Sequence, residues 1–137
     1  MLDSKIIIID DSTSMLKMIE KIVKNVGFKN ITLAKDGLPA WQLLQETKLG
    51  SVKKFDLIIS DWQMDGMSGL ELLKNVRSDE ILKGTPFLMV TSNTEQIEIL
   101  TIIQAGVSDY IVKPFNAVKI QEKIKKILSK LITVSAA

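Results

Sequence analysis

The sequence predicts an α/β protein built on a doubly wound parallel sheet, and three observations lead to this prediction. Short apolar runs alternate with longer segments whose apolar residues recur at helical spacing, and such β-α pairs fill the 137 residues. The short runs are too apolar for strands with one face in water, as is typical of parallel strands covered on both sides. Polar residues follow directly after several runs, where a parallel sheet places its ligand sites.

Each expected strand is a short run rich in β-branched or aromatic residues. The first contains four consecutive isoleucines, and the fourth opens with Pro86, which a first strand position tolerates. The fifth ends before Lys113-Pro114, because proline cannot donate the next hydrogen bond of a sheet. In order, the expected strands are Lys5 to Asp10, Ile31 to Ala34, Phe55 to Ser60, Pro86 to Thr91 and Asp109 to Val112.

The expected helices alternate with these strands. In the first, Ile19 and Val26 belong to one apolar stripe, and Gly27 provides a C-terminal stop. Pro39 suits the first turn of the second helix, and Gly106 closes the fourth. In order, the expected helices are Ser12 to Val26, Ala40 to Thr47, Ser68 to Arg77, Glu95 to Gln104 and Ala117 to Leu131, followed by a frayed tail over residues 133–137.

Composition and charge fit one compact domain, and we expect a single domain over residues 1–137 with its core at about 5–131. The net charge of +2 is too small to favour nucleic acid or a membrane surface as the main partner. The absence of Cys and His excludes disulfides, thiolate nucleophiles and the commonest transition-metal ligands. No stretch is long and apolar enough for a membrane span, and no signal peptide pattern is present, so we expect a cytoplasmic protein.

Right-handed crossovers favour the strand order 2-1-3-4-5, with helices on both faces. In that order the first and third strands are neighbours, so Asp10, Asp11 and Asp61 converge at one sheet edge. The fourth and fifth strands bring Thr91 and Lys113 to the same edge. Taken singly, an Asp after a strand is more often a turn former or helix cap, and such a threonine or lysine is ordinary. Their coincidence at one edge favours a functional site.

The chemistry of that edge favours a bound cation. Two like charges about 4 Å apart repel by roughly 4 kcal/mol at an effective dielectric near 20, and here three carboxylates face one lysine. Oxygen ligands suit Mg²⁺, with Mn²⁺ as a substitute. With a cation and Lys113 present, the cleft could accept a phosphoryl group. Asp61 is then a credible nucleophile, since carboxylates form acyl phosphates.

The sequence resembles a response-regulator receiver domain, most closely the CheY-like chemotaxis type. The resemblance spans about residues 5–131 and is carried by Asp10-Asp11, Asp61, the segment Met89 to Thr91 and the segment Tyr110 to Phe115. It implies a flavodoxin-like (βα)5 fold and a phosphorelay role in a two-component system. Such a protein is a signalling switch rather than an enzyme, because it catalyses only its own phosphoryl transfer and slow autodephosphorylation.

The resemblance also assigns roles by position. It implies that a CheA-like histidine kinase phosphorylates Asp61 in a Mg²⁺-dependent reaction. Asp11 and Asp61 would ligate Mg²⁺ directly, together with the backbone carbonyl of Gln63, while Asp10 would act largely through water. Lys113 would pair with the phosphoryl group, and Thr91 would hydrogen-bond it. The Lys113-Pro114 bond is usually cis in such domains.

The output surface is expected on the fourth helix, the fifth strand and the fifth helix. The resemblance implies that Tyr110 turns inward as Thr91 shifts toward the phosphoryl group. The apolar residues of the fourth helix cannot share one stripe, so Ile99 and Ile103 are expected to form an exposed patch flanked by Lys123 and Lys126. This surface would suit an amphipathic acidic peptide from a flagellar motor switch protein or another effector. A phosphatase is a further expected partner, and the protein is expected to be a monomer.

Several residues depart from the family pattern or leave alternatives open. Asp65 stands where the family often has proline, which adds a carboxylate near the metal rim. Gln63 and Asn93 occupy positions that tune dephosphorylation in the family. A haloacid-dehalogenase-like phosphatase remains an alternative, although it would want an Asp where Gln63 stands. A flavodoxin-like nucleotide binder is another, prompted by Ser12-Thr13-Ser14 but opposed by the adjacent carboxylates. A third is a receiver domain cut from a longer regulator with an output domain.

Overall fold

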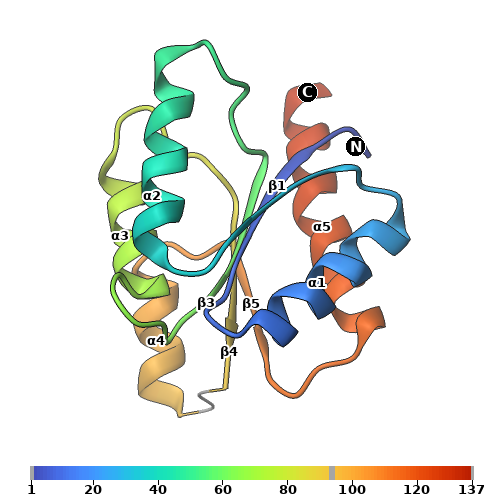
Figure 1. Ribbon diagram of the computed structural model, residues 1–137, viewed down its shortest axis with the longest axis vertical. Coiled ribbons are helices and arrows are strands. Elements are labelled where there is room, and N and C mark those ends of the chain that lie inside the picture. Colours follow the sequence, from blue (N-terminus) through green and yellow to red (C-terminus); the bar gives the residue numbers. More distant parts are fainter. Residues whose placement is uncertain (1, 93–94, 137) are drawn as a thin grey trace.

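The computed structural model describes the backbone of residues 2–92 and 95–136 and the side chains up to Ser129 (Figure 1). Its five strands form one parallel sheet in the order β2-β1-β3-β4-β5, as the sequence predicted. The strands are β1 (Lys5–Ile9), β2 (Asn30–Ala34), β3 (Leu57–Asp61), β4 (Phe87–Thr91) and β5 (Asp109–Val112), and the helical elements are α1 (Thr13–Val26), α2 (Gly37–Glu46), the short 3-10 helix η1 (Thr47–Leu49), α3 (Gly69–Ser78), α4 (Gln96–Gln104) and α5 (Ala117–Ala136).

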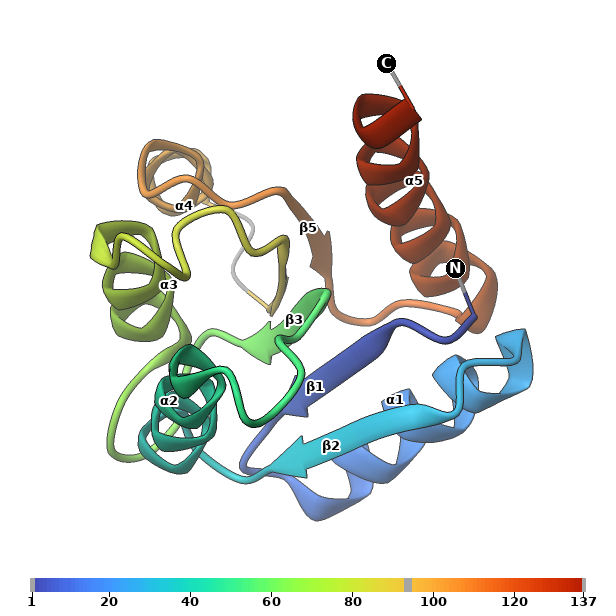
Figure 2. The same ribbon diagram turned by 90° about the horizontal axis from the view of Figure 1, so that it is seen from above.

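Helices cover both faces of the sheet, which explains the apolar character of its strands. Alternate strand residues point to opposite faces. Ile6 and Ile8 therefore pack in one core cluster with α1 and α5, while Ile7 and Ile9 pack in a second cluster with α2, α3 and α4. Figure 2 shows the same division seen from above. Because both faces are covered, ligands can approach the strands only from their ends.

The strand register brings the polar strand ends to one edge. Ile9 of β1 lies beside Ser60 of β3, so Asp10 and Asp61 follow on adjacent strands. Asp61 in turn lies beside Val90, the residue before Thr91. Thr91 lies beside Val112, which Lys113 follows. The carboxyl ends of the strands thus meet at one edge, here called the site edge.

Helix caps fix the loops that leave the site edge. Ser12 caps α1 by accepting a hydrogen bond from Met15 N–H (3.3 Å), and Ser68 caps α3 by accepting one from Glu71 N–H (3.1 Å). The Asp36 carboxylate caps α2 by accepting a bond from Leu38 N–H (2.6 Å). Each cap satisfies backbone donors that the first helical turn leaves unpaired. The loops after β1, β2 and β3 are therefore short and held at their helical ends.

Some boundaries differ from the sequence prediction. The second helix begins at Gly37 instead of Ala40, because Asp36 acts as its cap and Pro39 falls inside its first turn. It passes into η1, which is followed by Gly50 with a φ of +82°, a conformation that favours glycine. Residues 132–136 continue helix α5 beyond its predicted end at Leu131. This segment contains neither Gly nor Pro to end the helix.

None of the helices in the described part of the chain combines the length and the apolar character that crossing a membrane requires.

Candidate functional site

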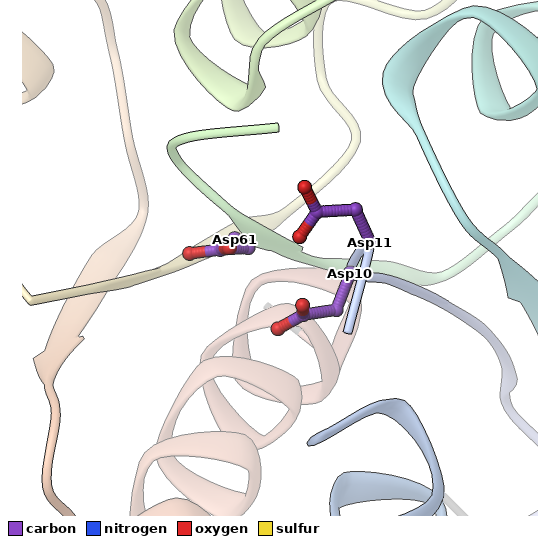
Figure 3. A group of neighbouring side chains, drawn as sticks. All are labelled: Asp10, Asp11 and Asp61. Atoms are coloured by element: carbon purple, nitrogen blue, oxygen red, sulfur yellow. The ribbon is translucent and has the colours of Figure 1, made fainter. Parts of the chain in front are cut away.

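Three aspartates gather at the site edge (Figure 3). Asp10 follows β1 and has a fully buried side chain, Asp61 ends β3 and is 8% exposed, and Asp11 is exposed. One carboxylate oxygen from each lies within 4.8 Å of the others, a separation that a single metal ion could bridge. The structure thus brings together the three carboxylates that the sequence had placed on neighbouring strands.

Lys113 supplies the positive charge of this cluster. Its Nζ lies 3.2 Å from Oδ1 of Asp61 and 3.6 Å from Oδ2 of Asp10. Its backbone N–H donates to the Thr91 carbonyl (2.7 Å), which ties the end of β5 to the end of β4. The Lys113-Pro114 peptide bond is cis, as expected. The lysine is therefore positioned between the two buried carboxylates.

One ammonium does not balance this cluster. Oδ1 of Asp10 accepts a hydrogen bond from Ser12 N–H (2.9 Å), but its buried Oδ2 accepts none from the described residues. Burial raises the pKa of the Asp61 carboxyl, and the neighbouring Asp10 charge raises it further, against the opposing effect of Lys113. A hard cation would stabilise this arrangement. One buried carboxylate oxygen has no hydrogen-bond donor among the described residues, and the neighbouring carboxyl resists ionisation.

The loop between β3 and α3, residues 62–68, forms one wall of the site. Trp62 N–H donates to Oδ1 of Asp61 (2.9 Å) and so orients this carboxylate. Gly69 N–H donates to the Trp62 carbonyl (2.7 Å), which closes the base of the loop. A side chain at Gly69 would collide with the Asp61 carbonyl, so the loop requires glycine there. A shallow cleft of ≈ 310 Å³ opens beside the site and is lined by Asp11, Trp62, Gln63, Met64, Asp65 and Ser68.

The residues that the sequence assigned to switching lie beyond this cluster. Thr91 ends β4 and is buried at the site edge. Tyr110 lies beside Met89 on the neighbouring strand and is partly buried against the core cluster that includes α4. Gln63 is exposed in the cleft. Asn93 lies outside the described residues.

The expected output surface differs in part from its prediction. Ile103 is 51% exposed, but Ile99 was wrongly expected to be exposed and instead packs against the core. The reason is helical spacing, because Ile99 lies three residues before the buried Ile102 and shares its face. The exposed apolar residues of α4 are instead Ile97, Leu100 and Ile103.

The two lysines predicted beside this surface differ in their surroundings. Lys123 Nζ bonds to Oδ1 of Asp109 (3.0 Å) and lies 5.8 Å from the centre of the Tyr110 ring. The same carboxylate oxygen accepts the Tyr110 N–H (2.8 Å). Lys126 is exposed on α5. A hollow of ≈ 440 Å³ between β5 and α5 includes Tyr110, Lys119 and Lys123 in its lining.

Sequence reasoning missed two contacts between elements that are distant in the sequence. The pairing of Asp109 with Lys123 depends on how α5 lies against β5, which spacing within either element does not reveal. The contact of Gly37 with the loop after β3 was missed as well. Gly69, which directly follows this loop, indicates crowding against the Asp61 carbonyl and gives no signal of the Gly37 contact.

The fold and this site define an α/β domain with an acidic edge that could hold a cation, and comparison with known proteins identifies its family. Residues 6–125 match the family described as response regulator receiver domain. Chemotaxis protein CheY-3 of Vibrio cholerae serotype O1 is 42% identical over 127 residues, which make up 93% of this chain and 93% of that protein. Chemotaxis protein CheY of Pseudomonas aeruginosa is 41% identical over 93% of this chain and 98% of its own.

A solved structure of the chemotaxis response regulator CheY4 of Vibrio cholerae superposes with a TM-score of 0.77 and 31% identity, covering 90% of this chain and 98% of that one. The chain belongs to the response regulator receiver domain family and is a CheY-like receiver of the chemotaxis type. The flavodoxin-like fold predicted from the resemblance is confirmed.

Proposed function

We propose that this protein is a two-component phosphoacceptor that is phosphorylated on Asp61 by a histidine kinase, in a reaction that requires Mg²⁺ or its substitute Mn²⁺. The observation that carries the proposal is the cluster of Asp10, Asp11 and Asp61 with Lys113 between its two buried carboxylates. Its family membership and its chemotaxis-type relatives support the same role.

In the transfer step, a carboxylate oxygen of Asp61 attacks the phosphorus of a phosphohistidine, the P–N bond breaks and an aspartyl phosphate forms. Trp62 N–H and Lys113 both contact Oδ1 of Asp61, so they hold the carboxylate in place before attack. Lys113 then pairs with the transferred phosphoryl group, and Thr91 hydrogen-bonds it. Water later cleaves the acyl phosphate, which is the slow autodephosphorylation expected of such a switch.

Oxygen atoms at the cluster fit a magnesium ion. Asp11, Asp61 and the Gln63 carbonyl would hold the ion, and Asp10 would act through water. When bound, the ion neutralises the charge that gathers on the phosphoryl oxygens. The buried Oδ2 of Asp10, which accepts no hydrogen bond from the described residues, supports this assignment.

Phosphorylation would be read on the face formed by α4, β5 and α5. The added charge draws the Thr91 hydroxyl toward the phosphoryl group, and Tyr110 responds on the neighbouring strand. The partner surface would comprise Ile99, Ile103, Tyr110, Lys123 and Lys126, with Ile99 contributing from its partly buried position. Its exposed apolar residues and lysines suit an amphipathic acidic peptide.

The partners that fit are a CheA-like histidine kinase, a flagellar motor switch protein or another effector, and a phosphatase. The chemotaxis names of the relatives favour the motor switch. We place the protein in the cytoplasm as a monomer that binds neither nucleic acid nor membrane.

The proposal is tested by incubating the protein with acetyl phosphate and Mg²⁺ and measuring its mass. We expect an adduct of one phosphoryl group that requires Mg²⁺ and is lost in Asp61→Asn. Glu80→Gln is the control, because Glu80 is an exposed carboxylate outside the acidic cluster and the cleft, and it should leave the adduct intact. An adduct that persists in Asp61→Asn would place the chemistry elsewhere, and steady turnover of phosphomonoesters would favour the phosphatase alternative.

A further inference from the structure

We infer that the turn between β2 and α2, Asp36-Gly37, positions the loop of residues 62–68 for cation binding. Neither residue lies in the acidic cluster, and both precede Asp61 by more than twenty positions in the sequence. The inference rests on the proposed function in one respect, namely that the site binds Mg²⁺. It goes beyond that function by assigning a positioning role to residues outside the site.

Gly37 contacts the backbone of the loop directly. Its N–H donates to the Met67 carbonyl (3.2 Å), and Gly37 itself is buried. A Cβ atom at this position would collide with the same carbonyl oxygen and would lie 2.9 Å from Cβ of Met67. These atoms belong to the backbone and to the root of a side chain, so no flexible side-chain end can move aside. Any side chain at position 37 must therefore displace the loop or α2.

The neighbouring Asp36 supports the same contact from a second point. Its carboxylate packs against Gly66, where an added Cβ would lie 3.2 Å from Oδ2. Gly66 has a φ of +76°, a conformation in which other residues are strained. The carboxylate is itself fixed, because it caps α2 through Leu38 N–H. A rigid helix end thus packs against two consecutive residues of the loop.

This outer contact complements the closure at the loop's base. Gly69 N–H holds the Trp62 carbonyl, and the Asp36-Gly37 turn holds Gly66 and Met67. The loop is therefore fixed at both ends, and the span between these contacts contains Gln63 and the cleft residues Met64 and Asp65.

Loss of the contact between the Asp36-Gly37 turn and residues Gly66 and Met67 should lower the affinity for the cation more than it lowers the stability of the fold. The proposed ligand at Gln63 is a backbone carbonyl, so its position would follow the loop and no rotamer change could restore it. Groups that orient metal ligands from outside typically change metal affinity about 10- to 100-fold when they are removed. Ala is a better helix former than Gly, so substitution at the start of α2 has a favourable backbone contribution that offsets part of the lost contact.

The test is a Mg²⁺ titration of Gly37→Ala, followed by the emission of Trp62 in a Trp41→Phe background that leaves one tryptophan in the chain. We expect the Mg²⁺ dissociation constant to rise about tenfold while the far-ultraviolet circular dichroism is unchanged. Gly84→Ala is the matched control, because a Cβ there meets no atom within 4 Å, and it should bind Mg²⁺ like the parent. Unchanged affinity in a folded Gly37→Ala protein would overturn the inference.

A second pair of variants keeps the inference testable if Gly37→Ala does not fold. Asp36→Asn keeps an oxygen for the α2 cap and a side chain of the same size against Gly66, whereas Asp36→Ala removes both. We expect Asp36→Ala to bind Mg²⁺ several-fold more weakly and Asp36→Asn to bind it like the parent. Equal affinities in these two variants would contradict a positioning role.

Failure of the proposed function would look different. In that case the parent itself would show no Mg²⁺ response that Asp61→Asn abolishes, and the inference about cation binding would fall with it. A parent that binds Mg²⁺ through Asp61, combined with unaffected turn variants, would overturn only the positioning role.

Discussion

Charged side chains at the two ends of the strands differ in how fully they are paired. At the site edge, three carboxylates crowd around Lys113, and Oδ2 of Asp10 is buried without a hydrogen-bond donor among the described residues. At the opposite edge, Arg77 donates to the carbonyls of Gly106 (2.8 Å) and Thr85 (2.6 Å), and also to that of Lys83 (2.9 Å). Arg77 thereby joins the end of α3 to the loops before β4 and β5.

Asp79 shows the same contrast among carboxylates. It bonds to Lys48 Nζ (2.6 Å) and accepts the backbone N–H groups of Ile81 (2.9 Å) and Leu82 (3.1 Å). These bonds, led by that from Lys48, lower its pKa, whereas burial and Asp10 raise the pKa of Asp61. The opposite edge therefore stabilises the fold, and the site edge retains an imbalance that a ligand can relieve.

The largest effect on stability is expected at Arg77. Arg77→Met removes the donors for three carbonyl groups, of which only the Thr85 carbonyl lies in a partly buried bond, while those of Gly106 and Lys83 are exposed to water. A hydrogen bond from a charged donor contributes about 1.5–3 kcal/mol when it is shielded from water and less when it is exposed. We expect the free energy of unfolding in urea to fall by about 2 kcal/mol, with Mg²⁺ affinity unchanged. Arg77→Lys should recover part of this loss. If Arg77→Met kept the stability of the parent but bound Mg²⁺ more weakly, the separate roles assigned to the two edges would be contradicted.

A smaller loss is expected at Asp79. Asp79→Ala removes the acceptor for two backbone N–H groups, which resembles the loss of a helix cap and should cost about 1 kcal/mol at neutral pH. Because the folded pKa is lowered, this stabilisation is present above the ordinary pKa of 3.8 and is lost as the pH falls through the folded pKa.

Urea unfolding of the parent and Asp79→Ala over a pH series measures this difference. Glu80→Ala is the control, because its contact with Lys83 lies on the surface (3.2 Å) and such pairs contribute about 0–1 kcal/mol. A difference that persists unchanged at low pH would show that ionisation of Asp79 plays no part.

The smallest effect, and the only gain, is expected at Asp61. Asp61→Asn removes a carboxylate that burial and Asp10 disfavour, so without divalent cations the variant should unfold at a slightly higher urea concentration at neutral pH. The folded pKa of Asp61 is raised, so the parent's stability falls as the pH rises from 3.8 through that pKa. The higher stability of Asp61→Asn relative to the parent should therefore vanish in acid. When Mg²⁺ is added and stabilises only the parent, the parent should become the more stable of the two proteins.

Much of the fold follows from local patterns. The isoleucines of β1 and the apolar stripe of α1 identified their elements, and right-handed crossovers then fixed the strand order. Strand order also placed Asp10, Asp11 and Asp61 together, since register carries adjacent strand ends to one edge. The roles of these residues in phosphorylation stay predictions until the adduct is measured.

The parts that sequence reasoning missed depend on packing between elements. Ile99 and Ile103 are the same residue type on the same helix. Only the rotation of α4 against the sheet decides that Ile99 faces inward. The contact of Gly37 with Met67 depends on where α2 begins relative to a loop that is distant in sequence. A turn glycine is recognisable locally, but the backbone that it approaches is not.

The short helix η1 has a practical consequence for experiments on the protein. It ends at Leu49, which is 82% exposed, and a side chain at the following Gly50 would meet no atom within 4 Å. This bend follows the C-terminal end of α2, at the opposite end of that helix from the Asp36-Gly37 turn. Exposed loop tips tolerate added segments. A tag inserted after Gly50 and bound to a surface would therefore hold the molecule by the end of α2 that lies away from the Asp36-Gly37 turn. The acidic site edge would then face the solution.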